Sequence, residues 1–135
     1  MTTARIVHLV DDDAAVRSSI GGLLRLGGFL VREYPSGRVL LERAAALEDG
    51  CILLDLRMPD VSGLEVQAEL SRLGIDLPIV FLTAHGDVPT GVSAMKRGAA
   101  DFLQKPVRES VLVEALRQGF TRLDGQVDRR AAEQR

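Results

Sequence analysis

The stretch Cys51-Ile52-Leu53-Leu54-Asp55-Leu56-Arg57-Met58-Pro59-Asp60 decides the fold of this chain. Its apolar half, Cys51 to Leu54, runs directly into the acid Asp55, and Pro59 follows four positions later. A short apolar run that ends at a turn signal predicts a fully buried strand. Asp55 would then stand at the carboxyl end of that strand, where open α/β sheets place their ligand sites. Taken alone, such an aspartate more often just begins a turn.

Length and composition limit what the chain can be. Its 135 residues suffice for one domain and a short tail. The 17 basic and 19 acidic residues give a net charge of −2, which argues against a broad polyanion-binding face. One cysteine and two histidines exclude an intramolecular disulfide and a cysteine- or histidine-based metal site. Because no segment approaches the roughly 18 apolar residues of a membrane span, and no signal-peptide pattern is present, we expect a soluble, cytoplasmic protein without a membrane partner.

Strands and helices are predicted to alternate along the chain. Strand patterns occupy residues 5–10, 29–34, 51–55, 78–82 and 99–104. Helical patterns follow them, starting near Val16, Ser36, Ser62, Val88 and Val107. Short loops and apolar central strands predict a parallel sheet with helices on both faces. The second strand contains Arg32 and Glu33, so we expect it at an edge of the sheet.

Apolar residues spaced three or four positions apart predict which face each helix buries. The expected buried stripes are Val66, Leu70 and Leu73 in the third helix, and Val88, Val92 and Met95 in the fourth. The third helix also begins with a capping box, formed by Ser62 and Glu65.

Four of the five predicted strands end in a chemically useful residue: Asp11-Asp12, Asp55, Thr83 and Lys105. In a parallel sheet these ends share one edge, so we expect a single site. Crowded carboxylates require a proton or a cation, and oxygen ligands without His or Cys suit a hard ion such as Mg²⁺. A lysine and a hydroxyl suit phosphoryl oxygens, and an aspartate beside them is well placed to form an acyl phosphate.

Together, four motifs resemble the receiver domain of bacterial two-component response regulators. They are Val10-Asp11-Asp12-Asp13, Leu54-Asp55-Leu56-Arg57-Met58-Pro59, Leu82-Thr83-Ala84-His85-Gly86 and Phe102-Leu103-Gln104-Lys105-Pro106. The resemblance covers about residues 4–123 and is closest to the FixJ-type branch. It implies an α/β fold with a doubly wound five-stranded parallel sheet of strand order 2-1-3-4-5.

Carried over residue by residue, the resemblance implies that Asp55 accepts a phosphoryl group from a sensor histidine kinase. Asp12 and Asp55 would bind Mg²⁺, with Asp11 acting directly or through water. The backbone carbonyl of Arg57 would complete the protein ligands.

The same resemblance assigns roles around the acceptor. Thr83 and Lys105 would contact phosphoryl oxygens, and the Lys105–Pro106 peptide bond is expected to be cis. Phe102 matches the aromatic residue that turns inward as Thr83 moves toward the phosphoryl group. Ordinary core packing is the alternative role for Phe102.

Five polar residues near the motifs have weaker signals. Arg57 and His85 lie two positions after Asp55 and Thr83, where side chains tune the phosphoryl lifetime in the family; as solvated groups they need no such role. We interpret Asp13 as a first-turn helix charge, and Asp60 and Asp87 as turn and helix-start residues.

The sequence offers two alternatives to a phosphorylated receiver. Haloacid-dehalogenase-type phosphatases also use a strand-end aspartate with Mg²⁺, but they need a second acid two residues later, where this chain has Arg57. A degenerate receiver would signal without phosphorylation, although every acceptor-site residue is present here. We therefore do not expect a turnover enzyme.

The motifs do not specify which process the receiver domain controls. FixJ-type regulators carry a helix-turn-helix DNA-binding domain after the receiver, and this sequence contains none. We expect residues 4–123 to form the receiver, and the polar residues 124–135 to be a tail or the start of a linker. Transcription control through an output domain outside this chain is the preferred hypothesis, and a stand-alone phosphotransfer or protein-binding receiver is the alternative. The family also suggests a phosphorylation-dependent homodimer through the fourth helix and fifth strand.

Overall fold

The computed structural model describes residues 5–84 and 87–133 and shows alternating strands and helices. In chain order these are β1 (Ile6–Val10), α1 (Ala14–Leu26), β2 (Leu30–Tyr34), α2 (Gly37–Glu42), the 3-10 helix η1 (Ala44–Ala46), β3 (Cys51–Asp55), α3 (Gly63–Arg72), β4 (Ile79–Thr83), α4 (Val88–Lys96), β5 (Asp101–Gln104) and α5 (Glu109–Glu133). The strands form one parallel sheet in the order β2-β1-β3-β4-β5. The predicted doubly wound sheet is confirmed, and β2 lies at its edge as expected.

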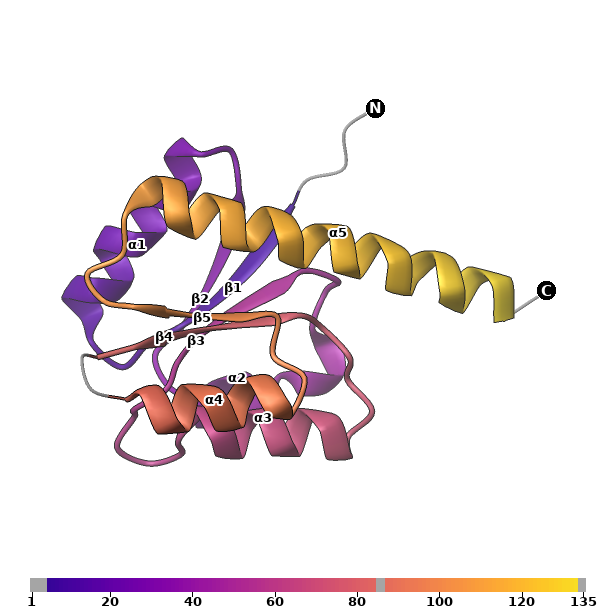
Figure 1. Ribbon diagram of the computed structural model, residues 1–135, viewed down its shortest axis with the longest axis horizontal. Coiled ribbons are helices and arrows are strands. Elements are labelled where there is room, and N and C mark those ends of the chain that lie inside the picture. The colour runs from indigo at the N-terminus through magenta and orange to yellow at the C-terminus, as the bar shows by residue number, and fades with distance from the viewer. Residues whose placement is uncertain (1–4, 85–86, 134–135) are drawn as a thin grey trace.

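Helices cover both faces of the sheet (Figure 1). α1 and α5 lie on one face, and α2, α3 and α4 lie on the other. Every residue of β3 and β4 is buried, which explains why both strands are apolar almost throughout. Successive side chains of a strand point to opposite faces, so Leu53 joins the core under α1 and α5, and Leu54 joins the core under α2, α3 and α4.

Side-chain caps fix where three helices begin. The carboxylate of Asp13 accepts hydrogen bonds from the backbone N–H groups of Ala15 and Val16, so this residue is the N-cap of α1 rather than a charge within its first turn. Ser62 caps α3, as predicted, and Ser36 caps α2 in the same way. Each such cap typically contributes about 1 kcal/mol of stability.

The predicted buried face of α4 is wrong. Val88, Val92 and Met95 are 51%, 43% and 40% exposed, and the helix instead buries Gly91 and Ala94. These two small residues let α4 lie close to the sheet, which turns the larger apolar side chains outward.

Leu73 was also expected in the core and is 45% exposed. It is the C-cap of α3, and the chain turns away at the following Gly74, whose φ of 75° suits a glycine.

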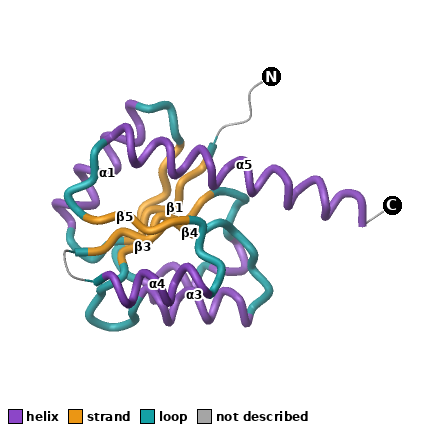
Figure 2. The backbone as a smooth tube through the Cα atoms, in the orientation of Figure 1, coloured by secondary structure: helices purple, strands orange, loops and turns teal. Residues whose placement is uncertain are grey.

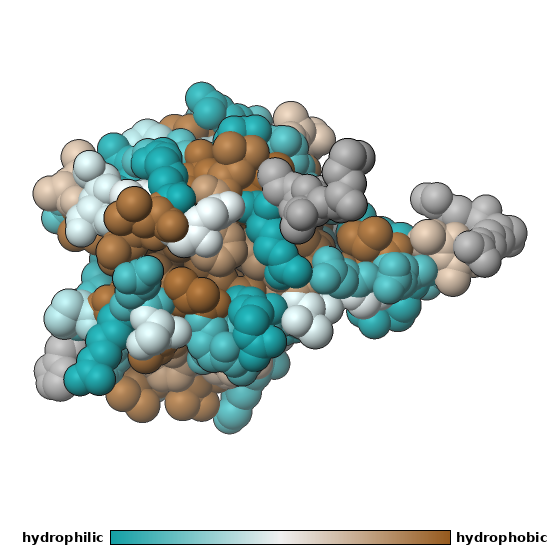
Figure 3. All heavy atoms as spheres, turned by 90° about the horizontal axis from the view of Figure 1, so that it is seen from above, coloured by the Kyte–Doolittle hydropathy of each residue, from teal (hydrophilic) through white to brown (hydrophobic). Residues whose placement is uncertain are grey.

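The last helix, α5, continues past the sheet to Glu133, as its uninterrupted coil shows (Figure 2). Figure 3 shows this end of the helix standing out from the body of the molecule, with a mostly hydrophilic surface. Leu123 and Gln126 are still buried, so the contact with the body extends to that point. Residues 124–133, expected as a tail or linker, are thus helical; the domain boundary at residue 123 stays a prediction. Among the described residues, no helix is long and apolar enough to cross a membrane.

Cys51 opens the central strand β3 and is fully buried, as expected for a small apolar residue. It faces α5 at Gly119, where an added Cβ would lie 2.9 Å from the sulfur atom. Burial raises the pKa of this thiol to about 12. The glycine therefore makes room for the sulfur, and α5 seals it from solvent.

His8 gives the protein a predictable sensitivity to acid. Its imidazole is buried on β1, where Nε2 donates to the Glu48 carbonyl oxygen at 2.9 Å and Nδ1 accepts from the Tyr34 hydroxyl at 2.9 Å. Burial lowers the pKa of His8 below its ordinary value of 6.5, despite the opposing contact with Glu48. As the pH falls, His8 therefore becomes protonated at a higher pH in the unfolded chain than in the folded protein. The free energy of unfolding accordingly decreases as the pH falls from 6.5 through the folded pKa. Across pH 7.5 to 5, urea unfolding should show that acidification lowers the stability of wild type relative to His8→Gln, because every other titrating group is common to both proteins; a constant difference between the two would contradict this.

Candidate functional site

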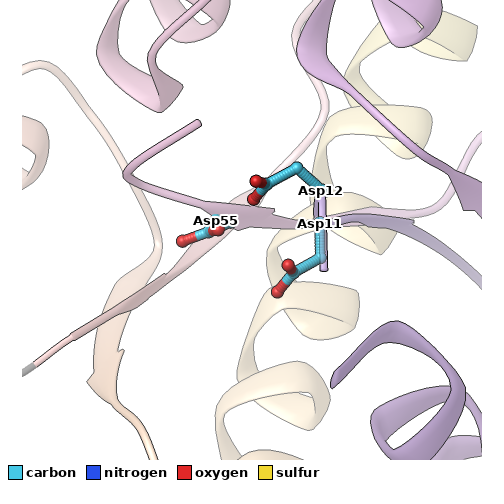
Figure 4. Close-up of side chains that lie close together, drawn as sticks. All are labelled: Asp11, Asp12 and Asp55. Atoms are coloured by element: carbon cyan, nitrogen blue, oxygen red, sulfur yellow. The ribbon is translucent and has the colours of Figure 1, made fainter. Parts of the chain in front are cut away.

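The carboxyl ends of the parallel strands bring the predicted site residues together at one edge of the sheet. Asp11 and Asp12 follow β1, Asp55 ends β3, and Lys105 follows β5. One carboxylate oxygen from each aspartate lies within 4.8 Å of the others (Figure 4). Because the fold alone sets this arrangement, positions that are distant in the sequence form one acidic cluster, as the strand-end pattern predicted.

Lys105 joins the cluster from the other side. Its Nζ donates to Asp11 Oδ2 at 2.9 Å and lies 3.6 Å from Asp55 Oδ1. Burial lowers the pKa of Lys105, but the hydrogen bond to Asp11 and the charge of Asp55 outweigh that effect and raise it. Asp11 is fully buried, and its Oδ1 accepts from the backbone N–H of Asp13 at 2.9 Å. Asp11 is therefore well satisfied by protein donors.

The negative charge of Asp55 is less well balanced by favourable contacts. Burial raises its pKa to about 6, and the negative charges of Asp11 and Asp12 act in the same direction. The charge of Lys105 and the backbone N–H of Arg57, 3.3 Å from Oδ1, oppose this rise. The site thus carries more negative charge than its own lysine neutralises.

This surplus of negative charge fits a divalent cation. All three donors are carboxylates, which suit a hard ion such as Mg²⁺. Asp12 is exposed while Asp11 and Asp55 are buried, so the cluster opens to solvent on one side, where water and phosphoryl oxygens have access. Asp12 and Asp55 would therefore hold the ion, with Asp11 already bound to Lys105.

Thr83 ends β4 next to this cluster, but its hydroxyl group faces another partner. Thr83 Oγ1 lies 3.0 Å from Asp87 Oδ2 and 3.2 Å from the carbonyl oxygen of Ala84. The other oxygen of Asp87, Oδ1, accepts from Nε and Nη2 of Arg57 at 3.1 and 2.5 Å. Asp87 therefore connects Thr83 with the loop that follows Asp55.

The sequence indicates a helix-start residue at Asp87 and does not reveal its contacts with Thr83 and Arg57. It does occupy the N-cap position of α4, but its side chain makes no capping hydrogen bond within the described residues. Arg57 lies thirty positions away, and no sequence pattern connects the two. The predicted role of His85 falls outside the described residues.

The remaining predicted residues lie on β5 and just after it. The Lys105–Pro106 peptide bond is cis, as the resemblance implied. Phe102 is partly buried and packs against the core under α2, α3 and α4. Its ring occupies the space beside Gly91 of α4, where an added Cβ would lie 2.4 Å from Cε2 of the ring.

Replacing Gly91 with alanine should therefore displace the Phe102 ring or push α4 away from the sheet. We expect a loss of about 1–3 kcal/mol from overpacking, reduced by the roughly 1 kcal/mol that alanine gains in a helix. Urea unfolding measures the stability, and NMR of labelled phenylalanine reports the ring. Gly22→Ala in α1 is the matched control, because its added Cβ would meet no described atom within 4 Å beyond its chain neighbours and the nearby backbone of its own helix, and it should stabilise the protein. Unchanged Phe102 signals in Gly91→Ala would contradict the prediction.

Comparison with known proteins identifies the family. The sequence model of the response regulator receiver domain family matches residues 7–117. The chain therefore belongs to the response regulator receiver domain family, which is a family of signalling domains rather than of metabolic enzymes. It is a receiver domain of the FixJ-like two-component regulators: the transcriptional regulatory protein FixJ of Azorhizobium caulinodans is 44% identical over 116 residues, which cover 86% of this chain and 55% of that protein.

Solved structures agree with this assignment. FixJ-N superimposes with a TM-score of 0.83 at 41% identity, covering 87% of this chain and 94% of that chain. The response regulator StyR superimposes with a TM-score of 0.90 at 40% identity, covering 98% of this chain and 67% of that chain. The chain spans about half the length of the curated relatives it matches. The predicted resemblance to FixJ-type receivers is confirmed, and the phosphatase alternative is set aside.

Proposed function

We propose that Asp55 accepts a phosphoryl group from a sensor histidine kinase. The observation that carries this proposal is the cluster of Asp11, Asp12 and Asp55 beside Lys105, whose Nζ is within reach of two of the three carboxylates. Among these acids, Asp55 combines burial with incomplete neutralisation, since its pKa of about 6 leaves it ionised and nucleophilic at neutral pH.

The reaction is a transfer between two nucleophiles. A carboxylate oxygen of Asp55 attacks the phosphorus of a phosphohistidine, a new O–P bond forms, and the P–N bond breaks. The histidine nitrogen keeps the electron pair of that bond and later takes up a proton from solvent. Lys105 holds a phosphoryl oxygen by its charge, and Thr83 would donate to another. Mg²⁺, when bound, neutralises charge on the transferring oxygens; Asp12, Asp55 and the backbone carbonyl of Arg57 would hold it.

Activation would pass from the acceptor to the α4 and β5 surface. Thr83 would turn toward the phosphoryl group, and Phe102 would rearrange against α4. Val88, Val92 and Met95 are exposed on that helix and supply an apolar surface for a second copy of the chain. Light scattering with and without Mg²⁺ and beryllofluoride tests this dimer, and an unchanged mass would count against it.

The output proposed for the domain is control of transcription. Curated relatives are named as transcriptional regulators and are about twice as long as the matched region, so DNA contact would come from a domain outside residues 1–135. A stand-alone receiver that passes phosphate or binds a protein is the second candidate. Arg57 is also proposed to tune the phosphoryl lifetime, because it follows Asp55 by two positions and its guanidinium is exposed.

The central test uses a small acyl phosphate with Mg²⁺ and intact-mass spectrometry. Wild type should gain one phosphoryl group, and Asp55→Asn should lose most of this adduct; a modest residue on a neighbouring acid is compatible with the proposal. Absence of any adduct in wild type, or full yield in Asp55→Asn, would refute Asp55 as the acceptor.

A further inference from the structure

We propose that Asp87 is a positioning residue for the phosphoryl transfer: it holds the Thr83 hydroxyl and the Arg57 guanidinium away from the acceptor until Asp55 is phosphorylated. This inference rests on the proposed function, and it assigns a role to a residue that the acidic cluster does not include. Asp87, Thr83 and Arg57 together form a unit that we call the Asp87 latch.

The geometry of the Asp87 latch gives each carboxylate oxygen its own partner. Oδ2 lies 3.0 Å from Thr83 Oγ1, and Oδ1 accepts both contacts from Arg57. The Asp87 side chain is only 14% exposed although Arg57 is 66% exposed, so the arginine covers the carboxylate from the solvent side. The Arg57 guanidinium supplies the counter-charge for the Asp87 carboxylate, and a charged acceptor binds a hydroxyl more strongly than a neutral one.

A hydroxyl group has one hydrogen to donate. While Thr83 donates to Asp87, it cannot donate to a phosphoryl oxygen on Asp55. Thr83 is fully buried, so water does not compete freely for this hydrogen. The Ala84 carbonyl oxygen, 3.2 Å away, is a second and neutral acceptor, so the charged Asp87 carboxylate is the stronger of the two resting partners and must be given up during activation.

A phosphoryl group on Asp55 would compete for both partners of Asp87. It adds close to two negative charges and three acceptor oxygens at pH 7. Arg57 follows Asp55 by two residues, and its backbone N–H already contacts Asp55 Oδ1 at 3.3 Å. Asp87 and the phosphorylated acceptor are therefore rivals for the same hydroxyl and the same guanidinium, and the latch opposes phosphorylation by the free energy needed to release them.

The Asp87 latch also explains how phosphorylation of Asp55 would change the position of α4. Asp87 directly precedes Val88, the first residue of this helix. When Thr83 leaves Asp87, the start of α4 loses one of its ties to β4. A plain surface ion pair between Arg57 and Asp87 would not have this consequence, because it would act independently of Thr83.

A double-mutant cycle separates these two cases. Rates of adduct formation with acetyl phosphate and Mg²⁺ are compared for wild type, Asp87→Ala, Thr83→Ala and the double variant. We expect Asp87→Ala to react faster by roughly tenfold, the weight of one hydrogen bond to a charged group. In the Thr83→Ala background the same substitution should accelerate the reaction less than it does in wild type, because only the Arg57 contacts are then left to release. Asp87→Asn, which keeps an acceptor oxygen, should fall between alanine and wild type.

Asp76→Ala is the matched control, because it removes an exposed acid far from the acceptor edge and should leave the rate unchanged. A second measurement does not depend on phosphorylation: the Thr83 side-chain rotamer, read by NMR couplings in the unphosphorylated protein. We expect one rotamer in wild type and averaging in Asp87→Ala.

The outcomes distinguish the latch from the proposed function. If wild type forms no adduct, the acceptor role fails, and the rotamer measurement still judges the latch. If wild type is phosphorylated but Asp87→Ala reacts at the same rate, or accelerates equally without the Thr83 hydroxyl, the latch is overturned and the acceptor role stands. A Thr83 rotamer that is unaffected by Asp87→Ala also overturns it.

Discussion

Lys105→Met should destabilise the metal-free protein by about 2–4 kcal/mol at pH 7.5, because it removes one partner of a largely buried ion pair. Asp11 is fully buried and would lose its contact at 2.9 Å, and Asp55 would lose a favourable charge at 3.6 Å. The loss should shrink near pH 5, where Asp55 is protonated, since its pKa of about 6 would rise further without the lysine. Urea unfolding in EDTA at both pH values measures the effect, and adduct formation with acetyl phosphate should fall sharply.

The matched control is Lys96→Met, at the exposed last residue of α4. Its stability should change by less than about 0.5 kcal/mol, as is usual for surface positions. Saturating Mg²⁺ should recover part of the loss in Lys105→Met, because a cation in the cluster replaces some of the missing charge. If both variants lose the same stability, the ion pair is not what stabilises this edge of the sheet.

Asp55→Asn should have the opposite effect and stabilise the metal-free protein at pH 7.5. The carboxyl group titrates near 3.8 in an unfolded chain and near 6 in the folded protein, so folding favours the protonated form. Stability therefore falls as the pH rises from 3.8 through 6, and the full loss is present above that range. Two pKa units correspond to about 3 kcal/mol, which sets an upper estimate for the gain on replacing Asp55 with a residue that cannot ionise.

The pH dependence distinguishes this effect from a general change in packing. Asp55→Asn should be more stable than wild type at pH 7.5 and nearly equal to it near pH 4. Mg²⁺ should stabilise wild type far more than the variant, because the variant has lost a ligand. Asp60→Asn, five residues further along the chain and outside the cluster, serves as the control and should respond to pH and Mg²⁺ as wild type does, because it keeps Asp55. A destabilised Asp55→Asn protein at pH 7.5 would contradict the prediction.

Much of the fold follows from residues that the sequence already displays. β3 and β4 are buried on both faces, so their apolar runs indicate central parallel strands, whereas Arg32 and Glu33 indicate an edge strand. The acidic cluster was predictable for the same reason: once the strands are parallel, Asp11, Asp12 and Asp55 must share an edge.

The orientation of α4 was not predictable from its apolar stripe. A periodic pattern identifies a helical face but not whether a core or a solvent-exposed surface receives it, and here Gly91 and Ala94 occupy the buried side. The packing of Phe102 beside Gly91 depends on a close approach of two elements, which composition does not reveal. The pairing of Arg57 with Asp87 joins two loops through side-chain geometry alone, and residue spacing carries no information about it.

The sealed thiol of Cys51 makes the protein its own unfolding reporter. It is the chain's single cysteine, fully buried beneath α5, and its pKa of about 12 leaves almost no thiolate at neutral pH. An alkylating reagent can therefore modify it only after the structure opens, so the labelling rate counts opening events rather than local chemistry. Variants at Lys105 and Asp55 can then be ranked in buffer without denaturant, under the same conditions in which phosphoryl transfer is measured.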